Sequence, residues 1–251
     1  MKLLIIGTMI EKNSSIRKNH RLLFLDGSIS KKINKQDALI SKKYIGKIHN
    51  IGRDLRIVVI ERSTEKEKIY ILQNAQVDFI RSLKISEHMG NFFKNFKDPA
   101  QETKKMLVNL AEENIVSIAY NEKNEIIGYL IVVKSQEERF NSEKTYQIGS
   151  IEVSKDYRNL GIAMELMKLF EDKFFDDKIV YTFCFSWHWD TRKCNVETYR
   201  KKILHLLYAQ SFIEEFINDT NIKMDPHNVF AVRYGKNTDP VLIKKFRERL
   251  I

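Results

Sequence analysis

The strongest constraint on the fold lies between residues 148 and 172, where a strand, a polar turn and an amphipathic helix follow one another directly. The strand-like run IGSIEV ends at Val153, and the turn SKDYRNL leads to Gly161, one of only nine glycines in 251 residues. After it, apolar residues recur at helical spacing: Ile162, Leu166, Leu169, Phe170 and Phe174. The pattern predicts a helix over 161–175 that begins at a glycine and packs through one face.

A glycine between a strand and a helix favours an anion-binding loop. The first N–H groups of a helix have no partner within the helix, and they lie at the positive end of its dipole. A residue without Cβ lets the main chain approach a bound phosphate closely. The loop RNLGIA, residues 158–163, therefore predicts a phosphate or pyrophosphate site. The alternative is a helix that simply begins at a glycine.

Other phosphate-binding loops do not fit this sequence. The chain contains neither the pattern G-x-x-x-x-G-K-[ST] nor the pattern G-x-G-x-x-G. Chemistry on a nucleoside triphosphate or a dinucleotide is therefore not expected.

The rest of the pattern indicates an α+β layered fold with a mixed central sheet and helices on both faces. Two helical segments, AQVDFIRSL and ETKKMLVNLAEEN, precede a hairpin formed by IVSIAY, the turn NEKNE and IIGYLIVV. The strand KIVYTFCFS, a helix over 196–209, the strands FIEEF and NVFAVRYG, and a terminal helix from Pro240 follow. Residues 1–66 contain the runs KLLIIG, RLLFLDG and LRIVVIE, which predict a small strand-rich extension before a domain over 67–251.

Composition excludes several classes of protein. Two cysteines, Cys184 and Cys194, cannot form a disulfide framework, and no spacing of ligand residues resembles a zinc site, so we expect no metal. No apolar run is long enough to cross a membrane, and MKLLIIGTMIEK reads as a first strand, which favours a cytoplasmic protein. The net charge of +10 is spread along the chain without a basic helix that carries stacking aromatic residues, so nucleic-acid binding is not expected.

In this context the loop RNLGIA resembles the acyl-CoA pyrophosphate loop of the GNAT superfamily of N-acetyltransferases, Arg/Gln-x-x-Gly-x-Gly/Ala. The segments FSWHWDTRKCNVETYRKKI and DPHNVFAVRYGKN, together with IGSIEVSKDYRNLGIA, are similar to the acetoin-utilisation acetyltransferase family, a branch that acetylates a lysine of acetyl-CoA synthetase. This resemblance covers residues from about 70 to 237. The loop of that family carries a glycine where this chain has Asn159, and asparagine tolerates a left-handed backbone better than most residues.

The resemblance implies a GNAT fold and acetyl-CoA as co-substrate, bound where two parallel strands separate. It assigns the pyrophosphate to the main-chain N–H groups of Asn159, Leu160, Gly161, Ile162 and Ala163. Arg158 would add positive charge, and the strand edge near Val153 would pair with the pantetheine amides. The implied reaction is direct attack of a protein lysine on the thioester, with acetyl-CoA synthetase as the implied partner.

A lysine with a pKa of about 10.4 must lose a proton before it attacks, so the reaction needs a base. Glu152 is the first candidate, although strand alternation turns it away from Ile151 and Val153, and a structural ion pair is the alternative. His188 is the second candidate, because alternation along residues 180–188 would place it on a face of small and polar groups; a substrate contact or a hydrogen-bonded histidine is the alternative. The opposite, aromatic face of that strand is expected to be core.

The departing thiolate needs a proton, and superfamily members often supply it from a tyrosine in a pattern like the LYAQSF of this chain. The match gives that role to Tyr208. Tyr208 lies about 120° from the apolar stripe of its helix, whereas Tyr199 lies on the stripe and is expected to be core.

Two other functions remain open at this level, an acetyltransferase for small amines and a non-catalytic acyl-CoA sensor. His227 in the segment DPHN is expected to shape a turn before a strand.

Overall fold

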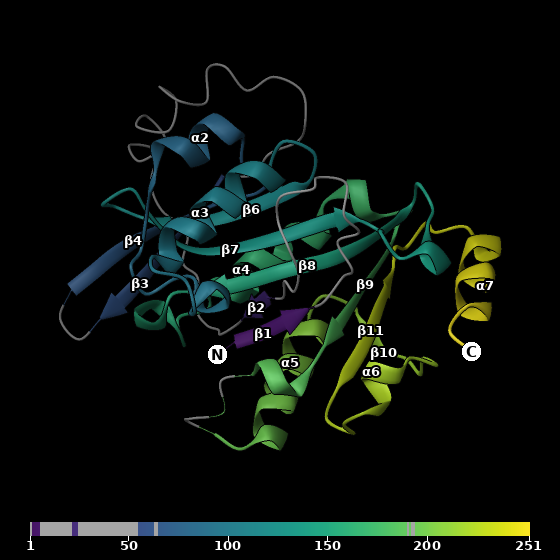
Figure 1. Cartoon of the computed structure of the whole chain (residues 1–251). Coiled ribbons are helices and arrows are strands. Elements are labelled where there is room, and N and C mark those ends of the chain that lie inside the picture. Colours follow the sequence, from purple (N-terminus) through teal and green to yellow (C-terminus); the bar gives the residue numbers. More distant parts are fainter. Residues whose placement is uncertain (1, 6–21, 25–54, 63–64, 190, 192–193) are drawn as a thin grey trace.

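The computed structural model describes residues 2–5, 22–24, 55–62, 65–189, 191 and 194–251, and every structural statement below concerns these residues (Figure 1). The strands are β1 (Lys2–Ile5), β2 (Leu22–Phe24), β3 (Leu55–Arg62), β4 (Glu65–Leu72), β5 (Lys84–Ile85), β6 (Ile115–Asn121), β7 (Glu125–Lys134), β8 (Thr145–Val153), β9 (Ile179–Cys184), β10 (Ile213–Glu214) and β11 (Val229–Tyr234). The α-helices are α2 (Val77–Ser82), α3 (Pro99–Leu110), α4 (Ile162–Met167), α5 (Val196–Tyr208), α6 (Thr220–Lys223) and α7 (Pro240–Glu248).

One mixed sheet organises the fold. Its strands follow the order β10-β11-β9-β8-β7-β6-β4-β3, and β5 adds a short parallel pair with β7. Neighbours along the main order are antiparallel, except that β8 and β9 are parallel. The expected mixed sheet is therefore confirmed.

The N-terminal runs expected to be strands correspond to β1, β2 and β3. The first two pair with each other in a separate sheet. In contrast, β3 pairs with β4 from Leu55↔Leu72 to Arg62↔Glu65, so it extends the main sheet across the boundary that we propose at residue 66.

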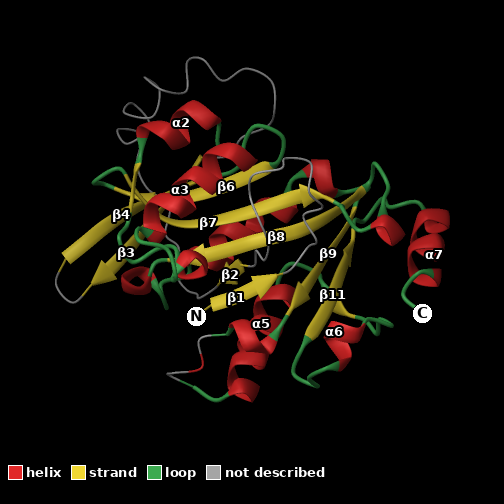
Figure 2. Cartoon of the chain, viewed as in Figure 1, coloured by secondary structure: helices red, strands yellow, loops and turns green. Residues whose placement is uncertain are grey.

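Helices cover both faces of the sheet (Figure 2). Adjacent residues of a strand point to opposite faces, and on β7 Leu130 and Ile131 belong to different apolar clusters. Ile131 packs in the cluster that contains Ile80 of α2 and Leu107 of α3. Leu130 packs in the cluster that contains α4 and α5. The sheet is thus the middle of three layers, because both of its faces are apolar and each is covered by helices.

The predicted helix over 161–175 is wrong in its second half. α4 ends at Met167, and two short 3-10 turns follow, separated by Asp172 in an extended conformation. The side chain of Asp172 accepts a hydrogen bond from the Phe174 N–H, so a local side-chain contact replaces the helical ladder. Phe174 is consequently 40% exposed, and Phe175 takes the buried position instead.

The predicted aromatic face is core within β9, but Trp187, which follows the strand, is 42% exposed. Tyr181 and Phe183 are buried, and Tyr181 lies against Phe140 with ring centroids 5.0 Å apart. Phe246 of α7 stacks on Phe140 at 4.6 Å and so ties the C-terminal helix to this cluster. Within the described part of the chain, the helices are too short or too polar to cross a bilayer.

Candidate active site

The sheet opens between its two parallel strands. β8 and β9 pair over Thr145–Gln147 and Ile179–Tyr181, and beyond these residues β8 continues to Val153 and β9 to Cys184 without pairing with each other. A bulge on β8 coincides with the separation, because the register with β7 changes from Ile131↔Ser150 to Val132↔Ile148 around Gly149. A bulge increases local twist and bends its strand. Beyond the paired residues the edge of β8 is no longer paired with β9, and β1 and β2 lie beside β8, with β1 also next to β9 (Figure 1).

The loop predicted to bind an anion lies at the end of β8. Asn159 has φ 63° and Gly161 has φ 81°, so both residues adopt the left-handed conformation. This is the physical reason for the glycine, because a side chain at positive φ costs about 1–2 kcal/mol. The asparagine at the neighbouring left-handed position follows the tolerance expected for that residue type.

The loop leaves the first N–H groups of α4 available for a ligand. Gly161 caps the helix without a side-chain hydrogen bond, and the first main-chain bond runs from the Glu165 N–H to the Gly161 carbonyl at 3.0 Å. Ile162 and Ala163 are fully buried against the sheet, which fixes the direction of these N–H groups. Arg158 donates from Nε to the Val153 carbonyl at 3.2 Å and braces the loop against the end of β8.

Glu152 lies on the opposite face of β8 from the loop helix. Ile151 and Val153 pack in the cluster of α4, whereas the fully buried Glu152 carboxylate accepts hydrogen bonds from the far side. The Gly90 N–H donates to its two oxygens at 3.1 and 3.2 Å, and the Tyr129 hydroxyl donates at 3.2 Å. The expected alternation is confirmed, and it separates Glu152 from bulk water.

A chain of hydroxyl groups connects Glu152 to the bulge. Ser150, beside the bulge, donates from Oγ to the Tyr129 hydroxyl at 3.3 Å, and Tyr129 in turn donates to Glu152. Burial, followed by the nearby Glu152 charge, raises the pKa of Tyr129 well above its ordinary value. The phenol therefore stays protonated and remains a hydrogen-bond donor.

The segment from Ser86 to Gly90 covers this side of β8. Ser86 and Ser154 share a hydrogen bond of 3.0 Å between their Oγ atoms, and His88 Nδ1 contacts the Asp156 carboxylate. With the Gly90 bond to Glu152, three contacts attach the segment to the end of β8. These residues could not be predicted from the sequence, because their partners lie more than sixty positions away along the chain and leave no local pattern.

The region that carries these features matches a known family. Residues 81–200 match the sequence profile of the acetyltransferase (GNAT) family. Residues 81–200 form a GNAT domain. The superfamily predicted from the loop is thereby confirmed.

The chain is also similar to acetoin utilization proteins in sequence and in structure. The acetoin utilization protein AcuA of Bacillus subtilis (strain 168) is 29% identical over 157 residues, which are 59% of this chain and 74% of that protein. The crystal structure of an acetoin utilization protein from Exiguobacterium sibiricum 255-15 has a TM-score of 0.68 and 22% identity, and the match covers 80% of this chain and 96% of that one. The fold is thus shared with that structure. The protein is an N-acetyltransferase, and acetyl-CoA is its acetyl donor.

Contrary to the sequence prediction, His188 does not lie on β9. β9 ends at Cys184, and Ser186–His188 form a 3-10 turn, so strand alternation does not reach residue 188. The ladder stops because the Ser186 N–H donates to Asn228 Oδ1 at 2.7 Å. His188 packs edge-on against Trp187 at 5.6 Å, not on the small, polar face of the strand.

Tyr208 lies in the last turn of α5 and is 51% exposed, whereas Tyr199 is buried and stacks on Trp189 at 5.2 Å. The predicted contrast between the two tyrosines is confirmed. The phenol of Tyr208 is accessible to a ligand.

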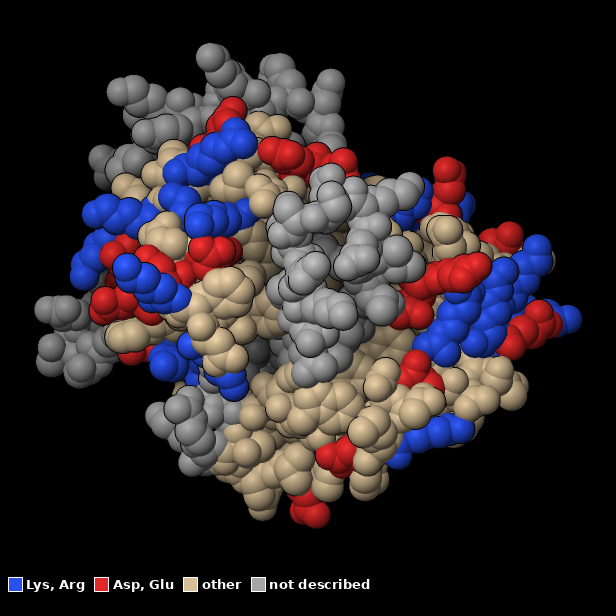
Figure 3. Space-filling view, viewed as in Figure 1, with Lys and Arg blue, Asp and Glu red and all other residues tan. Residues whose placement is uncertain are grey.

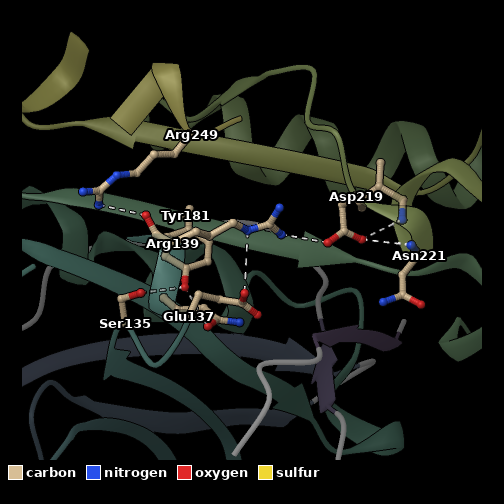
Figure 4. A network of polar contacts seen from close by, with 9 residues as sticks. Ser135, Glu137, Arg139, Tyr181, Asp219, Asn221 and Arg249 are labelled. Carbon is tan, nitrogen blue, oxygen red and sulfur yellow. Dashed lines mark hydrogen bonds and ion pairs between the residues drawn. The ribbon is translucent and has the colours of Figure 1, made fainter. Parts of the chain in front are cut away.

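A polar network lies where β8 and β9 still pair, just before the two strands separate (Figure 4). The Tyr181 hydroxyl on β9 lies 2.9 Å from Ser135 Oγ and donates to Gln147 Oε1 on β8 at 3.1 Å. Beside it, Arg139 donates to Asp219 Oδ2 at 2.7 Å, which links the segment after β7 to the start of α6. The buried Tyr181 contacts hold β8 and β9 together at the point where the two strands part.

Proposed function

We propose that this acetyltransferase modifies a lysine of a protein, and that acetyl-CoA synthetase is its acceptor. The observation that carries the proposal is the separation of β8 and β9 next to the left-handed loop, because it offers a strand edge and a helix N-terminus to one ligand. The similarity to AcuA and the segments FSWHWDTRKCNVETYRKKI and DPHNVFAVRYGKN support the choice of a protein acceptor.

The shape of the surface also favours a protein over a small amine. The hollow beside Trp187, at the end of β9, is open to solvent. A small-amine enzyme is expected to enclose its acceptor among acidic groups, whereas a protein substrate needs an open approach.

Each part of the site then has a proposed role. The N–H groups of residues 159–163 bind the pyrophosphate, and the edge of β8 near Val153 binds the pantetheine amides. Arg158 holds the loop in place, since its Nε already bonds to the Val153 carbonyl. The exposed hydroxyl of Tyr208 donates a proton to the departing thiolate.

Glu152 is the proposed proton acceptor, although its burial rules out direct contact with an acceptor in bulk solvent. The lysine nitrogen attacks the thioester carbonyl, the carbon–sulfur bond breaks, and the nitrogen releases one proton. We propose that the hydroxyls of Ser150 and Tyr129 relay this proton to Glu152, because each already donates to the next. His188 is the alternative proton acceptor.

Replacing Glu152 with glutamine tests the relay. We expect kcat to fall about 100-fold, because general-base catalysis contributes a factor of this order. The dissociation constant of acetyl-CoA should stay within a factor of about two, since the loop lies on the other side of β8. Steady-state kinetics and calorimetry measure the two quantities. An unchanged kcat for Glu152→Gln, combined with a large loss in His188→Gln, would transfer the role to His188.

The function itself is tested with labelled acetyl-CoA and purified acetyl-CoA synthetase. We expect label on one lysine of the synthetase, located by mass spectrometry of its peptides. Label on added polyamines but not on the synthetase would favour the small-amine enzyme. Binding of acetyl-CoA without transfer to any amine would contradict catalysis and favour an acyl-CoA sensor.

A further inference from the structure

A polar cluster outside the proposed acetyl-transfer machinery lies where β9 ends and β11 begins. Ser186 directly follows β9 and Phe185, while Asp225 and His227 precede β11, which pairs with β9 through Val229↔Cys184. Asn228 accepts from the Ser186 N–H and donates to the Asn221 carbonyl, both at 2.7 Å, so it fixes the two segments together. His227 therefore does more than shape a turn.

Asp225 is the centre of this cluster. Its Oδ1 accepts from the N–H and from Nδ1 of His227, each at 2.8 Å, and its Oδ2 accepts from the Ser186 hydroxyl. Burial acts to raise the pKa of Asp225, but the hydrogen bonds from Ser186 and His227 outweigh it and hold the pKa below its ordinary value. At neutral pH the group is a carboxylate.

The hydrogen-bond directions leave acceptor sites of Asp225 and Ser186 facing outward. A carboxylate provides about four acceptor sites, and three are occupied in Asp225. Since Nδ1 of His227 donates to a carboxylate, Nε2 of a neutral ring is an acceptor. The Ser186 hydroxyl has given its hydrogen to Asp225 and also presents lone pairs. A ligand for Asp225 and Ser186 must bring hydrogen-bond donors, and Asp225 supplies a negative charge.

Thr191 and three apolar side chains complete the walls of the hollow beside this cluster, which has a volume of about 590 Å³. Trp187 is 42% exposed, and Phe185 stacks on its indole with centroids 4.7 Å apart. Met224 is 71% exposed, and Val196 lies at the start of α5. An aromatic face attracts a cation, and thioether and alkyl groups suit the methylene stem that carries it. In Figure 3 the lower part of the molecule, over α5 and α6, is mostly uncharged.

We propose that this hollow binds a lysine or arginine side chain of the acceptor protein, close in its sequence to the lysine that is acetylated. The inference rests on the proposed function, because it assigns the partner to a protein acceptor. The cluster follows the C-terminal end of β9, as the loop of residues 158–163 follows the C-terminal end of β8, so both border the open end of the separation. A basic residue held here orients the target segment across the opening.

Asp225→Asn tests the hollow with little change in shape. We expect the KM for acetyl-CoA synthetase to rise about 10-fold, with kcat and the dissociation constant of acetyl-CoA unchanged. Asp177→Asn is the matched control, because Asp177 is also a hydrogen-bonded carboxylate next to β9 but lies before its N-terminal end. Equal KM values in wild type, Asp225→Asn and Asp177→Asn would overturn the proposal and leave the acetyl transfer intact.

A second measurement does not depend on transfer to any protein. n-Butylammonium, which mimics a lysine side chain, is titrated into the full chain while the indole N–H signal of Trp187 is followed by NMR, with Trp187→Phe to assign it. We expect a saturable shift in wild type and Asp177→Asn, its loss in Asp225→Asn, and no shift with n-butanol. The same response in Asp225→Asn, or an equal response to n-butanol, would overturn cation binding. This readout decides the inference even where the synthetase is not acetylated.

Discussion

Replacing Gly90 with alanine is expected to lower the free energy of unfolding by about 4 kcal/mol, the largest effect we anticipate from a single methyl group in this protein. Gly90 has φ 84°, and an added Cβ would lie 2.1 Å from the Pro99 carbonyl oxygen and 2.8 Å from Thr103 Oγ1. The carbonyl is main chain at the start of α3, so it cannot rotate away as a side chain would. Left-handed strain and a main-chain clash therefore add together.

Urea denaturation followed by circular dichroism measures this change. Gly149→Ala is the matched control, because its Cβ would meet nothing closer than Val133 Cγ1 at 3.5 Å, an ordinary contact. Its free energy of unfolding should stay within about 1 kcal/mol of wild type. Similar losses in both variants would show that the conformation of the Ser86–Gly90 segment does not set the stability.

Gly161→Glu is expected to weaken the binding of acetyl-CoA about 1,000-fold, or about 4 kcal/mol. The change places a carboxylate at the helix N-terminus where the pyrophosphate is proposed to bind, and like charges repel strongly in a partly desolvated site. It also forces a side chain into φ 81°. Titration calorimetry with acetyl-CoA measures the loss.

Gly161→Asn separates charge from strain in this experiment. Asparagine tolerates the left-handed conformation and is neutral, as Asn159 already shows two residues earlier. We expect its affinity to fall about 10-fold, far less than for glutamate. Equal losses in the two variants would assign the effect to the backbone, and wild-type affinity in Gly161→Glu would remove the loop from the coenzyme site.

The anion-binding loop and most helices and strands could be predicted because each is encoded by residues close together in the sequence. Gly161 and Asn159 lie two residues apart in a short polar turn, and residue types that tolerate positive φ are few. Helical and strand periods likewise located α5 and the β6–β7 hairpin close to their observed bounds, whereas α3 begins three residues before the predicted segment and ends four residues before its end. The contrast between Tyr199 and Tyr208 followed from the same helical period.

The predicted ends of a helix and a strand were wrong where a side chain replaces a main-chain hydrogen bond of the regular element. Asp172 ends the helical region early, and Asn228 stops β9 before His188. A bulge at Gly149 places Ile148 and Ile151 in the same cluster, three residues apart, which simple alternation along a strand does not allow. The Gly90 bond to Glu152 joins residues sixty-two positions apart, so no pattern within either segment reveals it.

The separation of β8 and β9 also gives the sheet an internal edge, beside which β1 and β2 lie without joining the main sheet. Main-chain groups on such an edge readily accept another strand-like partner, and an edge without a partner favours association between chains. The proposed pairing of acetyl-CoA with β8 would cover this edge, and a bound ligand at 100 times its dissociation constant stabilises the folded state by about 2.7 kcal/mol. We therefore expect the protease resistance and the cellular lifetime of this enzyme to follow the supply of its own substrate.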